Sequence, residues 1–175
     1  MKKNVYLLAL FFVASIIFTS CGARRRAIQD PAVVIDGVRW ATRNVDTSGS
    51  FTKNPEDAGG LFDWYEAQDT CPRGWRLPTR EELQSLKNAT GGEWTAVNEV
   101  NGRTFGTMPN QLFLPAAGWR SGYDGLLRNV GVVGHYWSST QSSSEYAVRL
   151  LFYSGDVVVG SPWRQDGQSV RCVAK

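Results

Sequence analysis

Three cysteines and a single histidine are the side chains of this chain that are best suited to covalent or metal chemistry. They are Cys21, Cys71, Cys172 and His135. One histidine without a Cys-x-x-Cys pair gives too few ligands for a zinc site, so we expect no metal. No serine stands in a Gly-x-Ser-x-Gly elbow, and phosphate-binding glycine loops are missing. The residues therefore predict a non-catalytic protein without a cofactor.

The first twenty residues have the layout of an export signal. Two lysines precede an apolar run over 5–18, which is short for a membrane span of about 20 apolar residues. Two small residues then stand directly before Cys21, an arrangement that resembles the lipobox of bacterial lipoproteins, in which the cysteine is acylated. We expect a signal peptide over 1–20, a lipidated tether over 21–32 and a membrane anchor through lipid on Cys21. An ordinary secretory signal is the alternative.

The other two cysteines are expected to pair. With Cys21 assigned to lipid, Cys71 and Cys172 remain, and two cysteines in an exported chain usually form a disulfide. A disulfide between residues this far apart stabilises the fold by about 4.7 kcal/mol in the chain-entropy description, which is an upper figure. Two buried free thiols are the alternative.

The positive charge of the chain belongs to its beginning. Loss of the two signal-peptide lysines leaves 17 basic residues against 16 acidic ones, and three of the basic residues are Arg24, Arg25 and Arg26. The rest of the mature chain is slightly acidic, so nucleic acid is not an expected partner. The three arginines either lie against lipid headgroups or form a solvated tether.

Local signals place helices in the first half and strands in the second. Asp36-Gly37 between two apolar runs predicts a hairpin over 33–40. Apolar spacing predicts a short helix over 61–68, with Tyr65 on its inner side. The capping box of Thr79 and Glu82 predicts a second helix, which ends at 91–92.

The remaining segments are mostly predicted as loops and strands. Residues 92–111 have the composition of a loop with one short strand, and 118–125 that of a loop rich in glycine and aromatic residues. Strands are predicted around 112–114 and 135–140, and a final one over 168–173. Helices followed by mostly antiparallel strands point to an α+β fold.

Six segments in order resemble the Fibrobacter succinogenes major paralogous domain family. They are GVRWATRNV at 37–45, GLFDW at 60–64, CPRGWRLPT at 71–79, LPAAGWR at 114–120, YWSST at 136–140 and SVRCV at 169–173. The resemblance predicts one domain over 33–175. It implies a C-type-lectin-like fold, related to that of formylglycine-generating enzymes, with two helices beside a twisted antiparallel sheet and long ordered loops.

That resemblance also implies a role for the cysteine pair. In the lectin fold a disulfide ties the helical half to the final strand, and Cys71 and Cys172 would take that part. Calcium binding is not expected, because the Glu-Pro-Asn pattern is absent and Ser138 and Ser139 stand where lectins carry carboxylate ligands. The copper-binding cysteine pair of the formylglycine-generating enzymes has no counterpart that we can place.

The seven tryptophans are the best remaining guide to function. Trp40, Trp64, Trp75 and Trp137 are predicted to be core, whereas Trp94, Trp119 and Trp163 lie among glycine, polar and proline residues. The candidate ligand-binding residues are Trp119, Arg120, Tyr123 and Asp124 in one loop, and Trp163 and Arg164 in another. The simpler alternative is that these rings cover the sheet and fill the edge of the core.

These observations predict a binding or adhesion module held to the cell envelope by its lipid. The expected place is the outer membrane, with a position facing the periplasm preferred over the cell surface because arginines follow Cys21. The ligand would be a glycan or another protein. A structural subunit of an envelope or surface assembly is the second interpretation, and an enzyme of the formylglycine-generating type is the third.

Overall fold

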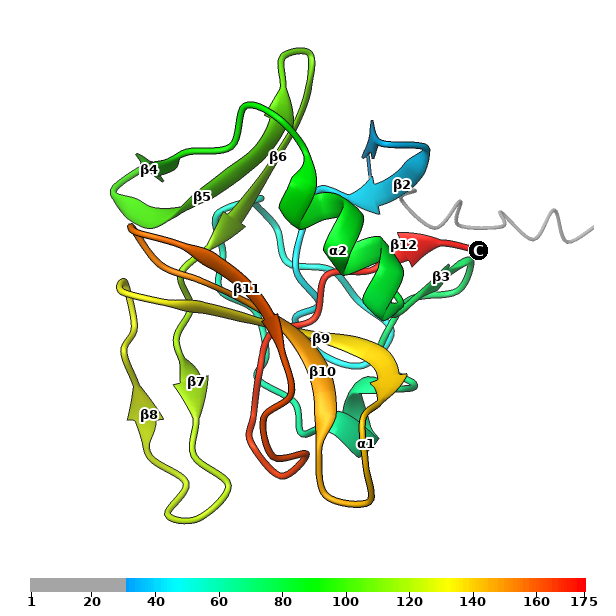
Figure 1. Cartoon of the computed structure of the whole chain (residues 1–175), viewed down its shortest axis with the longest axis vertical. Coiled ribbons are helices and arrows are strands. Elements are labelled where there is room, and N and C mark those ends of the chain that lie inside the picture. Colours follow the sequence, from blue (N-terminus) through cyan, green and yellow to red (C-terminus); the bar gives the residue numbers. More distant parts are fainter. Residues whose placement is uncertain (1–30) are drawn as a thin grey trace, which may run out of the picture.

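The computed structural model describes residues 31–175, and Figure 1 shows their arrangement. The predictions for the signal peptide, for Cys21 and for the tether up to residue 30 lie outside the described residues. Within 31–175, no helix has the length and apolar character needed to cross a membrane.

Twelve strands and two helices make up the described part of the chain. They are β1 (Ala32–Ile35), β2 (Val38–Ala41), α1 (Trp64–Ala67), β3 (Trp75–Arg76), α2 (Arg80–Asn88), β4 (Trp94–Val97), β5 (Val100–Thr107), β6 (Asn110–Pro115), β7 (Trp119–Arg120), β8 (Leu127–Arg128), β9 (Gly134–Gln141), β10 (Ala147–Phe152), β11 (Val157–Gly160) and β12 (Val173–Ala174). The strands form four small sheets, ordered β1-β2-β12-β3, β11-β10-β9, β4-β5-β6 and β7-β8.

The prediction of an α+β, C-type-lectin-like fold is wrong: the chain is mainly β, with several small antiparallel sheets and two short helices. The first predicted helix shrinks to the four residues of α1, because Phe62 pairs with Gln168 in an antiparallel bridge and Asp63 caps the helix start. The segment 92–111, predicted as a loop with one short strand, instead contains the hairpin of β4 and β5 and the start of β6. The turn of that hairpin places Asn98 and Glu99 at φ values of 47° and 66°, and glutamate gives little signal for such a turn.

Several local predictions are confirmed. The hairpin of β1 and β2 turns at Asp36 and Gly37, with φ values of 48° and 79°. The capping box of Thr79 and Glu82 opens α2. The predicted final strand over 168–173 is reduced to β12, because the segment before it is buried and bonds to several different strands and loops rather than to one.

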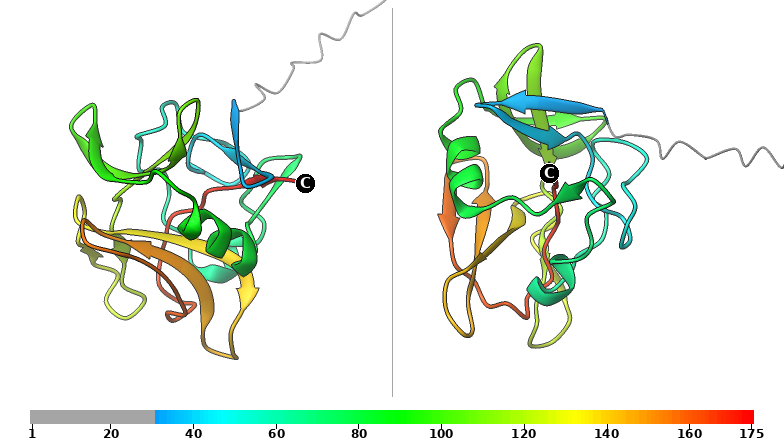
Figure 2. Two further views of the ribbon diagram at one scale, coloured as in Figure 1. Left: turned by 45° about the horizontal axis from the view of Figure 1, so that its top comes forward. Right: turned by 90° about the vertical axis from the view of Figure 1, so that its right-hand side faces the viewer.

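Two hydrophobic clusters form the interior. One lies around Trp40, Phe105 and Phe152, where α2 packs against the sheet of β9, β10 and β11. Figure 1 and the left view of Figure 2 show α2 covering that sheet. The other lies around Trp64 and Trp137.

The four tryptophans predicted to be core are all buried: Trp40, Trp64, Trp75 and Trp137. The disulfide between Cys71 and Cys172 is present, which confirms the predicted pairing. It joins the loop before β3 to the residue directly before β12, so it fixes one side of the four-stranded sheet.

Candidate functional site

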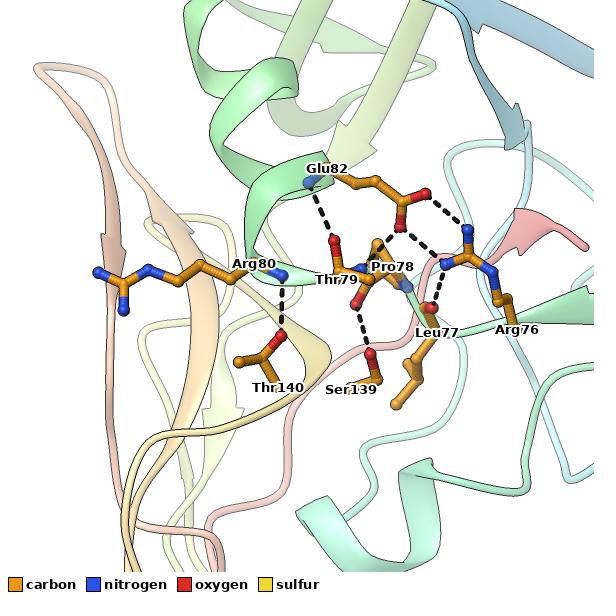
Figure 3. A network of polar contacts seen from close by, with 8 residues as sticks. All are labelled: Arg76, Leu77, Pro78, Thr79, Arg80, Glu82, Ser139 and Thr140. Carbon is orange, nitrogen blue, oxygen red and sulfur yellow. Dashed lines mark hydrogen bonds and ion pairs between the residues drawn. The ribbon is translucent and has the colours of Figure 1, made fainter.

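The segment Arg76–Thr79 has a structural role. The Arg76 guanidinium donates to the two carboxylate oxygens of Glu82 at 2.8 and 2.6 Å, and lowers the pKa of that carboxyl. Figure 3 shows how the same segment holds the strand β9: the Ser139 hydroxyl donates to the Pro78 carbonyl at 3.3 Å. The Ser139 amide donates to the same carbonyl at 2.8 Å. The amide of Arg80 donates to the Thr140 hydroxyl at 2.9 Å. The motif segments 71–79 and 136–140 therefore contact each other at the start of α2.

A buried polar network joins four more motif residues. The Arg171 Nε–H donates to the Asn44 side-chain oxygen at 2.9 Å, and the Asn44 amide group donates to the Tyr136 hydroxyl at 3.2 Å. That hydroxyl donates to the Pro115 carbonyl at 2.9 Å. Because Asn44, Tyr136 and Arg171 are at most 1% exposed, ligands cannot reach them. The motifs thus specify the fold, and the binding surface must be sought in the loops.

The first candidate loop is the hairpin of β7 and β8. Trp119 is half-buried and stacks on His135, with ring centroids 5.9 Å apart and planes 21° apart. The Arg128 guanidinium lies 5.9 Å from the Trp119 ring on the same hairpin. Burial, with a smaller contribution from the Arg149 charge, lowers the pKa of His135 to about 3. Trp119 is therefore packed between a neutral imidazole and a cation.

The polar residues of this hairpin mainly hold it in place. Arg120 donates to the Leu61 carbonyl at 3.0 Å, and Asp124 forms an ion pair with Arg128. A backbone hydrogen bond from Leu126 is the largest cause that lowers the pKa of Asp124. Tyr123, by contrast, is 91% exposed at the tip.

Large apolar side chains follow Tyr123 along the surface. They are Leu126, Leu127, Val130 and Val132, each more than half exposed. We call Tyr123 together with these four residues the hairpin patch. Apolar side chains that are exposed singly are normal on a protein surface, whereas a group of them within ten residues is unusual.

The second candidate loop lines a hollow of about 250 Å³. The hollow is bounded by Tyr65, Ser144, Glu145, Trp163, Arg164 and Gln165. The exposed fractions of Tyr65 and Trp163 are 58% and 51%, so two aromatic rings face solvent around one concavity. We call it the aromatic hollow.

The rings of the aromatic hollow are held from behind. The Trp163 indole N–H donates to the Tyr146 hydroxyl at 2.7 Å. Arg164 is buried, with its guanidinium 4.5 Å from the Trp64 ring centroid and 5.7 Å from that of Tyr65. It also donates to the carbonyl of Ser143. Arg164 thus supports the rings and has little surface left for a ligand.

The structure brings the two predicted loops side by side. The Gly122 amide donates to the Asp166 carboxylate at 3.1 Å, and the amides of Arg120 and Gly167 exchange hydrogen bonds with each other's carbonyls at 2.8 Å. Figure 1 shows the tip of the β7–β8 hairpin, the loop before β12 and α1 at the lower end of the molecule.

Sequence reasoning missed Tyr65, which it had placed on the inner side of a longer helix. In the four residues of α1, Trp64 and Ala67 are the buried pair, three positions apart, and Tyr65 points outward. The spacing of Trp64 and Ala67 alone was the available signal. Residues 31–175 contain no group of three or more histidine, cysteine, aspartate or glutamate side chains placed to hold a metal ion.

Comparison with known proteins identifies a family. Residues 34–174 match the family described as the Lcl C-terminal domain, which is nearly the whole domain predicted from 33 to 175. The match does not extend to the lectin-like fold that the sequence resemblance implied. No curated protein and no solved structure matches the chain.

Proposed function

Since the chain belongs to the family of Lcl C-terminal domains, we propose that it is a non-catalytic binding module of the cell envelope, and that the aromatic hollow binds a glycan. The anchor of this module is the lipid on Cys21, and its site is the outer membrane. The disulfide between Cys71 and Cys172 supports a location outside the cytoplasm, where disulfides persist.

The observation that carries the proposal is the pair of exposed rings of Tyr65 and Trp163 around one concavity. The apolar face of a sugar ring can lie on an aromatic ring, while its hydroxyls need hydrogen-bonding groups at the edge. Glu145 and Gln165 line the same hollow and supply such groups.

The rings are also ordered before any ligand arrives. The hydrogen bond from Trp163 to Tyr146 and the guanidinium of Arg164 behind Tyr65 fix their positions. A site whose side chains are already immobilised loses less conformational entropy on binding. The ordered rings therefore support the interpretation of the hollow as a binding site.

A glycan array followed by calorimetry with the best soluble hit tests the proposal. Trp163→Ala and Tyr65→Ala should each weaken binding about 30-fold, as expected for the loss of an aromatic anchor at the centre of an interface. Tyr123→Ala is the matched control, because Tyr123 is an exposed aromatic outside the hollow. Equal losses for all three variants, or no hit on the array, would contradict glycan binding at this site.

Acylation of Cys21 is tested separately. Intact-mass analysis of the native protein should show a chain that begins at Cys21 and carries fatty acyl chains. An unmodified cysteine would remove the anchor from the proposal and leave the glycan site untouched.

The hairpin patch supports a second function, the binding of a protein partner within an envelope assembly. Its apolar side chains are exposed together on one hairpin, next to the hollow. Cross-linking in intact cells should capture a partner that Leu127→Glu loses and Trp163→Ala retains. A partner that survives Leu127→Glu would place the interface elsewhere.

A further inference from the structure

A basic surface of the described chain lies outside both candidate loops. A groove of about 740 Å³ opens on the four-stranded sheet and the loops beside it. Its lining includes the basic residues Arg39, Arg43, Arg73 and Lys175 around the rings of Phe51 and Trp75. No lining residue has a carboxylate side chain. We call it the basic groove.

Three of the four basic side chains that line the groove are exposed. Arg39 lies 5.9 Å from the ring centroid of Trp75, and Arg43 lies 5.7 Å from that of Phe51. The two rings pack edge to face, with centroids 5.6 Å apart, and form the floor. Arg39, Arg73 and Lys175 are exposed, and within residues 31–175 the two ion pairs, Arg76–Glu82 and Arg128–Asp124, involve none of them. Arg43 donates to the Thr52 carbonyl at 3.0 Å. The exposed Arg39, by contrast, can stack on Trp75 and still present donors to an anion.

The groove lies where the described chain begins. Arg39 is on β2, which pairs with β1, and the Thr42 amide donates to the carbonyl of Pro31. Figure 1 and the right view of Figure 2 place the start of β1, β3 and the end of β12 on one side of the molecule. Pro31 lies ten positions after Cys21, and a chain of that length spans at most about 35 Å when extended.

From this charge and this position we infer that the basic groove binds the phosphate headgroups of acidic phospholipids. The inference rests on the envelope location proposed above, and it assigns the membrane to one side of the domain. Arg39 and Arg73 contact the headgroups, and the three arginines at 24–26 add to the attraction. The aromatic hollow and the hairpin patch then face away from the bilayer, toward their ligands.

Vesicle flotation tests the inference with a probe that carries no lipid. The chain from residue 21 onward, with Cys21→Ser, is mixed with vesicles of phosphatidylcholine alone or of phosphatidylcholine with phosphatidylglycerol. We expect binding to the acidic vesicles only, and weaker binding as salt is raised. Arg39→Gln with Arg73→Gln should weaken it about 25-fold, because one basic residue near an anionic surface contributes about fivefold.

The matched control is Arg80→Gln, which removes an exposed arginine on α2 outside the groove. Its binding should equal that of the parent chain. Because Arg24, Arg25 and Arg26 are present in every probe, unchanged binding by the Arg39/Arg73 variant would show that the tether alone holds the vesicle, and would overturn the inference.

A soluble polyanion is the other occupant that the charge could accept. Dextran sulfate that binds through Arg39 and Arg73, together with failure of the chain to float with acidic vesicles, would also overturn the inference. Since the probe carries no acyl chain and binding is assigned to the groove by its loss in the Arg39/Arg73 variant, neither result depends on acylation of Cys21 or on glycan binding at the hollow.

Discussion

The basic groove and the aromatic hollow both combine arginines with aromatic rings, but a different partner faces solvent in each. In the groove, Arg39 and Arg43 lie over the rings of Trp75 and Phe51, and the rings form the floor. In the hollow, Arg164 is buried behind the rings, and the aromatic surface faces solvent.

This difference sets the chemistry that each surface offers. A cation–π contact is an attraction between a guanidinium and the face of a ring, whichever of the two is outermost. An outer guanidinium presents donors to a phosphate, whereas an outer ring presents an apolar face to a sugar. The list of residue types alone therefore says little about the ligand, and the order of the layers decides it.

Removal of the disulfide is expected to have the largest effect on stability and to affect the two surfaces unequally. Cys71→Ser with Cys172→Ser removes the cross-link between two walls of the basic groove, the loop at 72–75 and the residues 174–175. A loop of this size predicts a loss of up to about 4.7 kcal/mol in the free energy of unfolding, which urea denaturation measures. Where the variant is still folded, vesicle binding should fall more than glycan binding; equal losses would contradict a separate role for the two surfaces.

Acid should weaken the fold through His135, which lies beneath Trp119 at the base of the β7–β8 hairpin. Its folded pKa of about 3 is below the ordinary 6.5, so between these pH values the unfolded chain binds more protons. Stability therefore falls as the pH drops from 6.5 toward 3, by up to about 4 kcal/mol.

His135→Phe isolates that contribution, because phenylalanine keeps a ring against Trp119 but cannot titrate. The free energy of unfolding is measured against pH for both proteins. The variant should lose less stability than the parent between pH 6.5 and 3, and parallel curves would show that His135 is not held neutral by the fold.

Exchange of an arginine for methionine at each surface tests the order of layers directly. Arg164→Met removes the cation behind the rings and should weaken glycan binding about tenfold, with no change in vesicle binding. Arg39→Met should weaken vesicle binding and leave glycan binding unchanged. A cross-effect in either direction would mean that the two surfaces are coupled.

The smallest effect is expected at the start of α2. Thr79→Ala removes the capping oxygen that accepts from the Glu82 amide and should cost about 1 kcal/mol in the free energy of unfolding. Thr79→Ser keeps the oxygen and should restore the stability. Neither ligand affinity should change, because Thr79 lines neither surface.

The sequence predicted the local features that depend on only a few neighbouring residues. The turn at Asp36-Gly37, the cap at Thr79 and the buried tryptophans are examples, because turn geometry, capping and hydrophobicity are short-range properties. It did not reach the number of sheets, or the hairpin that turns at Asn98 and Glu99. Those depend on which strands pair, and pairing is a long-range choice.

The same division holds for the binding surfaces. The sequence by itself determined that Cys71 and Cys172 would pair, and it marked the loops of Trp119 and Trp163 as candidates. Only the tertiary structure decided that Trp119 stacks on His135, that Arg164 turns inward, and that Tyr65 joins Trp163 at one hollow. The physical reason is that exposure and the order of stacked groups come from packing between segments far apart in the chain, which no local pattern of residues specifies.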